Sequence, residues 1–217
     1  PYIDYATGMN AALAIVSALH QLKHDQKGIV LDIAMLDTSL LLMASLMTNH
    51  LNTGWQPIAS GNEAWSQSPS SGAFETEQGL LMVAANNERQ YKDLCKALKL
   101  EYLLEDPRFS ILGNRKQNSK KLRELFAKMF LSGTAEFWEK QLEIFSVPAV
   151  KVRRLDEVLS EQQVLDRKLT KPIEIDGAAS SLHMPTLGFK VDGKTIAPKT
   201  APPRLGEDNS ILLNTPE

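Results

Sequence analysis

Three stretches near the start of the sequence predict an α/β fold in which helices cover a parallel sheet. Apolar residues recur at helical spacing over Tyr5–Lys23, an apolar extended run follows at Ile29–Met35, and Leu40–His50 reads as a second, almost wholly apolar helix. A strand that is apolar on both faces is typical of a parallel sheet covered on both sides. Helix, strand and helix in this order form half of a doubly wound α/β layer.

The first helix is expected to begin at an acidic cap. Asp4 stands just before the first apolar turn, and Gly8 and several alanines leave little bulk along the helix surface. Aspartate is among the best N-cap residues, because its carboxylate accepts a hydrogen bond from a first-turn N–H group. Asp37 is a second cap candidate, at the start of the helix that follows the strand. From the residue alone, a simple cap is the favoured interpretation of Asp4.

The middle of the chain predicts a smaller α+β unit. Its expected elements are a strand at Leu80–Ala85, a helix at Asn87–Leu98 capped by Asn86 or Asn87, a turn at Asp106-Pro107, a helix at Asn114–Leu131, a helix from Thr134 to Phe145, a strand at Ala149–Val152 and a helix at Leu155–Arg167. Cys95 is the single cysteine and lies among apolar residues at helical spacing. A buried, unreactive thiol is therefore expected there.

From Leu169 onward the chain is expected to be largely extended. Proline and glycine interrupt segments 169–175, 183–191 and 194–198, and a proline-rich tail leads into a short final helix. These changes of character divide the chain into three parts. Residues 1–74 form the end of a large domain with a linker loop, 75–178 a small domain, and 179–217 a tail that returns to the large domain.

The composition restricts the classes of partner. The 217 residues carry 24 basic and 26 acidic side chains, so net charge provides no attraction to nucleic acid or to an anionic membrane. The longest apolar runs, Ala11–Leu19 and Leu40–Met47, are shorter than the ~20 residues of a membrane span. No secretion signal is visible. A cytoplasmic location is expected, with an organellar location as the open alternative.

Two strings and several later motifs form a specific pattern. The strings are DYATGMNAALAIVSALHQ and KGIVLDIAMLDTSLLL, and the later motifs are Phe74–Thr76 with Gly79–Ala84, Leu94-Cys95, Asp106–Phe109, Arg115, Trp138, Val147–Ala149 and Pro202–Glu207. Together they span essentially the whole chain. The pattern closely resembles the class III coenzyme A transferases, the CaiB/BaiF family.

The resemblance implies a C-terminal half of such an enzyme. That half holds the C-terminal part of a Rossmann-like large domain, a small α+β domain and a returning extended tail. The N-terminal half of the same enzyme then becomes a partner, and family members form interlocked homodimers. The isolated chain is accordingly expected to be inactive.

The same resemblance matches Asp4 to the family's catalytic aspartate. It implies that Asp4 attacks an acyl-CoA thioester and forms an aspartyl–acyl anhydride, and that CoA passes through an aspartyl-CoA thioester to a small carboxylic acid. Coenzyme A is then a substrate, and neither a tightly bound cofactor nor a metal is implied. Gly8 is expected to let the ligand approach the helix backbone.

The loop at residues 60–72 is a second candidate region. In some family members a glycine-rich loop at this place covers the catalytic aspartate, which is a common role for lids. Gly61, Ser70, Ser71 and Gly72 are therefore expected near CoA, with a plain interdomain linker as the equally weighted alternative. Trp55 and Trp65 are expected to pack between domains rather than to line an acyl pocket.

Other functions are weighed against the transferase. An α-methylacyl-CoA racemase of the same superfamily would use Asp4 with an upstream histidine, and a folded fragment without activity is the non-enzyme alternative. His20 and His24 have the spacing of a metal pair but lack a third ligand, so solvated histidines are favoured. A serine hydrolase built on Ser70 and His183 lacks the nucleophile-elbow pattern.

Overall fold

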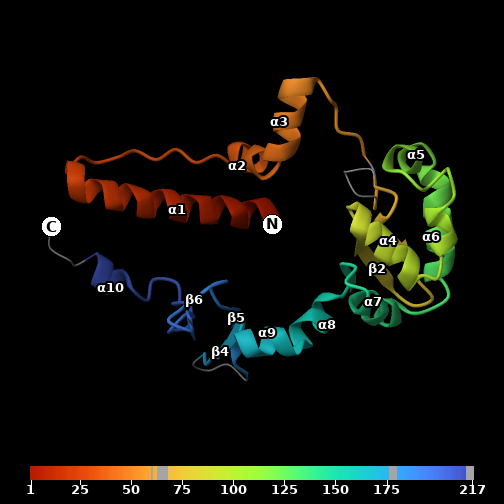
Figure 1. Cartoon of the computed structure of the whole chain (residues 1–217). Coiled ribbons are helices and arrows are strands. Elements are labelled where there is room, and N and C mark those ends of the chain that lie inside the picture. Colours follow the sequence, from red (N-terminus) through yellow and green to blue (C-terminus); the bar gives the residue numbers. More distant parts are fainter. Residues whose placement is uncertain (60, 63–67, 176–179, 214–217) are drawn as a thin grey trace. The chain divides into compact units, whose positions relative to one another are not determined.

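The structure, a computed structural model, describes residues 1–59, 61–62, 68–175 and 180–213. The chain divides into two compact units, Pro1–Gly61 and Asn62–Glu217 (Figure 1). Each unit is described by itself. The division at residues 74 and 178 stays a prediction, as does the Rossmann-like character of the first part.

The first unit consists of three helices. They are α1 (Tyr2–Asp25), α2 (Met35–Leu42) and α3 (Ala44–Thr53). Helix α1 packs against α2, and the Asn10 side chain donates a 3.4 Å hydrogen bond to the buried Thr38 hydroxyl.

Two expectations about the elements of this unit are wrong. The strand predicted at Ile29–Met35 does not form: residues 29–34 are a segment without ladder hydrogen bonds, and Met35 begins α2. Figure 1 shows this segment running back along α1. A strand needs a neighbour, and the described part of this unit offers none; Val30 is 96% exposed. The apolar helix predicted at Leu40–His50 is interrupted at Met43, where α2 ends and α3 begins.

The predicted acidic caps are also wrong. Helix α1 begins before Asp4, because the Tyr5 N–H donates to the Pro1 carbonyl at 3.2 Å and closes a turn that contains Asp4. Asp37 lies inside the first turn of α2, whose N-cap is Ala34. Both carboxylates therefore occupy first-turn positions, where the helix dipole favours a negative charge without a cap bond.

The second unit has its own hydrophobic core. A three-stranded antiparallel sheet runs in the order β1 (Ser71–Glu75), β2 (Leu80–Ala84) and β3 (Ala149–Lys151). Helix α6 contacts β1, and α7 contacts β2 and β3. The helical elements here are α4 (Glu88–Ala97), the short 3-10 helix η1 (Glu101–Leu104), α5 (Leu112–Gln117), α6 (Ser119–Phe130) and α7 (Ala135–Ile144). Phe126, Phe130 and Leu81 are among the side chains that are fully buried.

Local sequence features are confirmed in this unit. Asn87 caps α4 by accepting from the Gln90 N–H at 2.9 Å, and the Gln90 side chain bonds back to the cap in a capping box. Thr134 caps α7 by accepting from the Phe137 N–H at 3.1 Å. Strands β2 and β3 lie where they are predicted, and Cys95 is buried.

Two features of this unit depart from the prediction. Strand β1 was not expected, because its small residues lack the apolar alternation of a strand; it forms by pairing with β2, with Gly72 opposite Val83. The helix predicted at Asn114–Leu131 is two helices, since Asn118 leaves helical geometry and its side chain bonds to the Asn114 carbonyl at 2.9 Å.

The rest of the chain forms short helices and hairpins. Its elements are α8 (Leu155–Ser160), α9 (Gln162–Arg167), β4 (Thr170–Ile173), β5 (Leu182–Pro185), β6 (Lys190–Val191), β7 (Lys194–Thr195) and α10 (Asn209–Leu212). The extended character and the final short helix are as predicted, whereas the helix at Leu155–Arg167 breaks at Glu161. No described helix is both long enough and apolar enough to cross a membrane.

Candidate active site on the first helix

Asp4 occupies an exposed position in the first turn of α1. The N–H groups of a first helical turn have no partner within the helix and carry partial positive charge. Asp4 is therefore an accessible carboxyl group beside backbone N–H donors that have no partner within the helix.

Gly8 extends this accessible surface along the helix. It lies one turn after Asp4, so the two residues share a face of α1. A Cβ atom at Gly8 would meet no atom within 4 Å. The Thr7 hydroxyl, between them in sequence, donates to the Ile3 carbonyl at 2.7 Å and thus stays against its own helix. Asp4 and Gly8 thus lie on one exposed strip of α1, and a role of either residue in ligand binding stays a prediction.

The other predicted site residues lie in different surroundings. Ser70 and Ser71 are buried, and their hydroxyls donate to the Ala85 carbonyl at 2.7 Å and to Asn86 Oδ1 at 2.8 Å. Ser71 and Gly72 belong to β1, so the part of the predicted loop that holds them is a strand. Gly61 is exposed. Residue 60, residues 63–67 and with them Trp65 lie outside the described residues, and proximity of this region to CoA stays a prediction.

The serine-hydrolase and metal-site alternatives gain no support from the contacts of their residues. The Ser70 and Ser71 hydroxyls bond to Ala85 and Asn86 rather than to a histidine, and His183 is exposed on β5. His20 and His24 lie with their ring centroids 5.4 Å apart on the exposed end of α1. Within the described ranges, no three His, Cys, Asp or Glu side chains are grouped as metal ligands.

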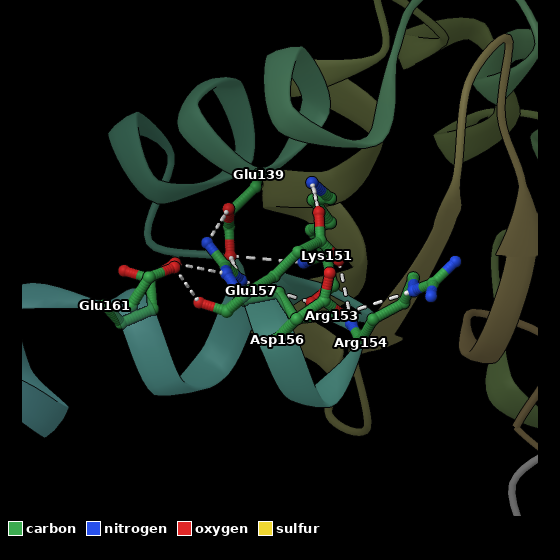
Figure 2. A network of polar contacts seen from close by, with 8 residues as sticks. Glu139, Lys151, Arg153, Arg154, Asp156, Glu157 and Glu161 are labelled. Carbon is green, nitrogen blue, oxygen red and sulfur yellow. Dashed lines mark hydrogen bonds and ion pairs between the residues drawn. The ribbon is translucent and has the colours of Figure 1, made fainter. Parts of the chain in front are cut away.

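A dense ionic network lies where the sheet of the second unit leads into α8 (Figure 2). The Arg153 guanidinium bonds both carboxylate oxygens of Glu139 at 2.9 Å and Glu161 at 2.6 Å. Lys151 pairs with Glu157 at 2.7 Å. These contacts connect α7, β3 and the α8–α9 segment.

The network is structural rather than catalytic. Hydrogen bonds from Arg153 hold the pKa of Glu139 below its usual range, and the bond from Lys151 does the same for the pKa of Glu157. The pKa of Arg153 is raised further by its bonds to Glu139 and Glu161. A general acid or base needs a pKa near the working pH, and these shifts move each group away from it.

A second charged contact joins a buried arginine of the same unit to an exposed glutamate. Arg115 is 3% exposed, pairs with Glu88, donates to the Phe109 carbonyl at 2.9 Å and stacks 4.1 Å above the Tyr91 ring. Burial raises the pKa of the neighbouring Cys95 thiol to about 11, so the thiol stays protonated and inert. The sequence marked Arg115 only as part of a family pattern, so this contact was not predicted.

Comparison with known proteins decides the family. A model of CoA-transferase family III matches residues 1–209. The chain belongs to CoA-transferase family III. An acyl-CoA transferase of Fusarium pseudograminearum is 30% identical over 212 residues, covering 97% of this chain and 46% of the relative. A succinyl-CoA:glutarate CoA-transferase of Mus musculus is 27% identical and covers 97% of this chain and 48% of the relative.

Solved structures agree on the fold of this family III chain. A Mycobacterium tuberculosis protein superposes with a TM-score of 0.81 at 23% identity, covering 99% of this chain and 55% of that structure. A CaiB/BaiF family protein from Brucella suis gives a TM-score of 0.80 at 21% identity, covering 98% and 54%. The chain spans about half the length of the curated relatives it matches.

Proposed function

We propose that this family III chain supplies the nucleophile of an acyl-CoA:carboxylate CoA-transferase, and that the nucleophile is Asp4. The observation that carries the proposal is the exposed carboxylate in the first turn of α1, one turn from the open surface of Gly8. Membership of the CoA-transferase family supports CoA transfer in general. The relatives with specific names are transferases, so the racemase alternative is not favoured.

The proposed reaction begins with attack of an Asp4 carboxylate oxygen on the thioester carbonyl carbon. The C–S bond breaks, its electron pair leaves on sulfur, and an aspartyl–acyl anhydride and CoA thiolate result. The thiolate then attacks the Asp4 carbonyl carbon of the anhydride. This step releases the donor acid as a carboxylate and leaves an aspartyl-CoA thioester.

The acceptor acid completes the cycle by the same two steps in reverse order. Its carboxylate attacks the aspartyl-CoA carbonyl carbon, which gives a second anhydride and frees CoA thiolate. The thiolate attacks the acceptor's carbonyl carbon, forms the new acyl-CoA and returns Asp4 as a carboxylate. Backbone N–H groups at the start of α1 are suited to stabilise negative charge that develops on oxygen in these steps.

The substrates are proposed as an acyl-CoA and a small carboxylic acid. Relatives of this chain are named for glutarate and for D-citramalate, so the family accepts acids of different structure. Neither a metal nor a resident cofactor is part of the proposal, and a cytoplasmic location is proposed with it.

We further propose that the enzyme works with the other half of the family's length, as a homodimer. Helix α1 buries no side chain and exposes an apolar stripe made of Tyr2, Tyr5, Met9, Leu13, Val16 and Leu19. Met9 is 74% and Leu13 65% exposed. Contiguous exposed apolar surface of this kind marks an interaction site. On its own, the chain is expected to show no exchange between acyl-CoA and carboxylate.

The experiment compares two first-turn aspartates in the full-length protein. Asp4→Asn removes the nucleophile and is expected to lower the rate of CoA exchange by roughly four orders of magnitude or more. Asp37→Asn changes an exposed acid at the matching position of α2 and should leave the rate unchanged. Exchange at the wild-type rate in Asp4→Asn would refute the proposal, as would an equal loss in both variants.

A further inference from the structure

The second unit contains a cavity of about 790 Å³ that the proposed reaction does not use. Its walls come from α9, the β4–β5 hairpin and the segment around β7. Three hydrogen bonds join these segments: the Thr186 N–H to the Leu169 carbonyl at 2.9 Å, and the Thr186 and Thr195 hydroxyls to the Lys168 and Arg167 carbonyls, each at 3.1 Å. We call this cavity the hairpin pocket. Its walls are fixed by these bonds, and its volume is in the range of small-molecule sites.

The hairpin pocket is lined by apolar and cationic side chains. Leu165, Leu169 and Pro172 are among the apolar ones, and Lys168, Lys171 and His183 are the titratable ones among the described lining residues. Among the described residues of the lining there is no carboxylate. A cavity of this composition is complementary to a molecule with an aliphatic body and one anionic end.

The two lysines differ in how they are held. The Lys171 ammonium donates one hydrogen bond to the Pro198 carbonyl at 3.1 Å, which fixes its position and leaves two of its three donors. Lys168 ends α9 in the left-handed conformation, with φ of 54°, and this turns the chain from the helix into β4. One cation is thus anchored, and the other sits at the corner where the helix and the hairpin meet.

We propose that the hairpin pocket binds an aliphatic carboxylate. The chain of the ligand packs against the leucine and proline side chains of the lining, and its carboxylate accepts hydrogen bonds from Lys168 and Lys171. The proposal goes beyond the transferase proposal and does not rest on it, because binding is measured without turnover at Asp4 and is located by variants of the second unit.

Isothermal titration of the full-length protein with octanoate tests the proposal. Octan-1-ol has the same chain without the charge, and acetate has the charge without the chain. Saturable octanoate binding that is at least about tenfold tighter than binding of either control is expected, because the pocket recognises both parts. Equal binding of octan-1-ol overturns the proposal. The absence of saturable octanoate binding overturns it too, whether the pocket lacks affinity or is filled by another part of the full-length protein.

Matched lysine variants locate the binding. Lys168→Gln and Lys171→Gln should each weaken octanoate binding by about fivefold or more, since a charged donor is lost. Lys190→Gln removes an exposed lysine on β6 outside the pocket and should have no effect. Equal weakening by Lys190→Gln, or none by the two pocket variants, contradicts the proposal. Leu165→Asp, which adds a negative charge to an exposed lining residue, should abolish octanoate binding, and full binding by this variant also contradicts the proposal.

Discussion

The two units of the chain use apolar residues in opposite ways. Helix α1 carries apolar residues at regular helical spacing, yet it buries no side chain, and Leu13 is 65% exposed. In the second unit, α6 carries Leu122, Phe126 and Phe130 at the same kind of spacing, and all three are fully buried. Periodicity therefore predicts a helix in both units, but only the second unit supplies the surface that covers it. The uncovered helix is also the one that presents Asp4.

Truncation of a buried side chain should give the largest difference in stability between the two units. Phe126→Ala removes a fully buried ring and is expected to lower the free energy of unfolding by about 3–5 kcal/mol, measured by denaturant unfolding followed by circular dichroism. Val16→Ala removes an exposed side chain of α1. It should change the free energy of unfolding of this chain by less than about 0.5 kcal/mol. A loss above 2 kcal/mol for Val16→Ala would show that the first unit buries this stripe after all.

Breaking the ionic network of Figure 2 should give the next largest loss of stability. Arg153→Met leaves Glu139 without its bidentate partner and breaks the bond to Glu161, so a loss of about 1–2 kcal/mol in unfolding free energy is expected. Arg154→Met is the matched control, because its ion pair with Asp156 is largely exposed. Similar losses in the two variants would mean that the network contributes no more than a surface pair.

Capping should give a smaller difference between the units. Thr134 accepts a bond from the Phe137 N–H, and Thr134→Ala is expected to cost about 1 kcal/mol. Asp4 lies inside its first turn and acts only through the helix dipole, so Asp4→Asn should cost about 0.3–0.5 kcal/mol. Thermal unfolding of both variants checks this order, and a larger loss for Asp4→Asn would restore the N-cap interpretation.

Acid should weaken the second unit slightly through Glu139. The pKa of Glu139 is lower in the folded state, mainly because Arg153 donates to its carboxylate. Ionised Glu139 therefore stabilises the folded state above the unfolded-state pKa of about 4.3, and this stabilisation is lost as the pH falls through the lower folded-state pKa. Below a pH of about 4.3, the free energy of unfolding of Glu139→Gln should fall less than that of the wild type, and the difference should be below about 1 kcal/mol. An unchanged acid profile in Glu139→Gln would contradict this assignment.

Local features of the sequence predicted the fold best where a few neighbouring residues decide it. Asn87 and Thr134 cap their helices with bonds that span three residues, so the sequence contains the whole interaction. The strand expected at Ile29–Met35 depends on a partner strand, which apolar content alone does not reveal. Strand β1 was missed for the complementary reason: its small residues are poor strand formers, and pairing with β2 determines their conformation.

The candidate sites show the same limit. Asp4 was identified by the resemblance of its surroundings to a family, because an acid at a helix start is otherwise an ordinary capping residue. Its place inside the first turn required the structure, since the Pro1 carbonyl starts the helix earlier than expected. The hairpin pocket was not predicted at all. Its walls come from segments separated in sequence, and the bonds of Thr186 and Thr195 that join them carry no recognisable motif.

Trapping of the covalent intermediate tests the role of Asp4 most directly. The full-length protein is incubated with an acyl-CoA, quenched in acid, digested and analysed by mass spectrometry. Added mass of the acyl or CoA group is expected on Asp4, and it should be absent in Asp4→Asn and retained in Asp37→Asn. An adduct on another residue, or rapid exchange with no adduct on Asp4 under conditions that trap acyl-enzymes, would contradict the proposal that Asp4 is the nucleophile.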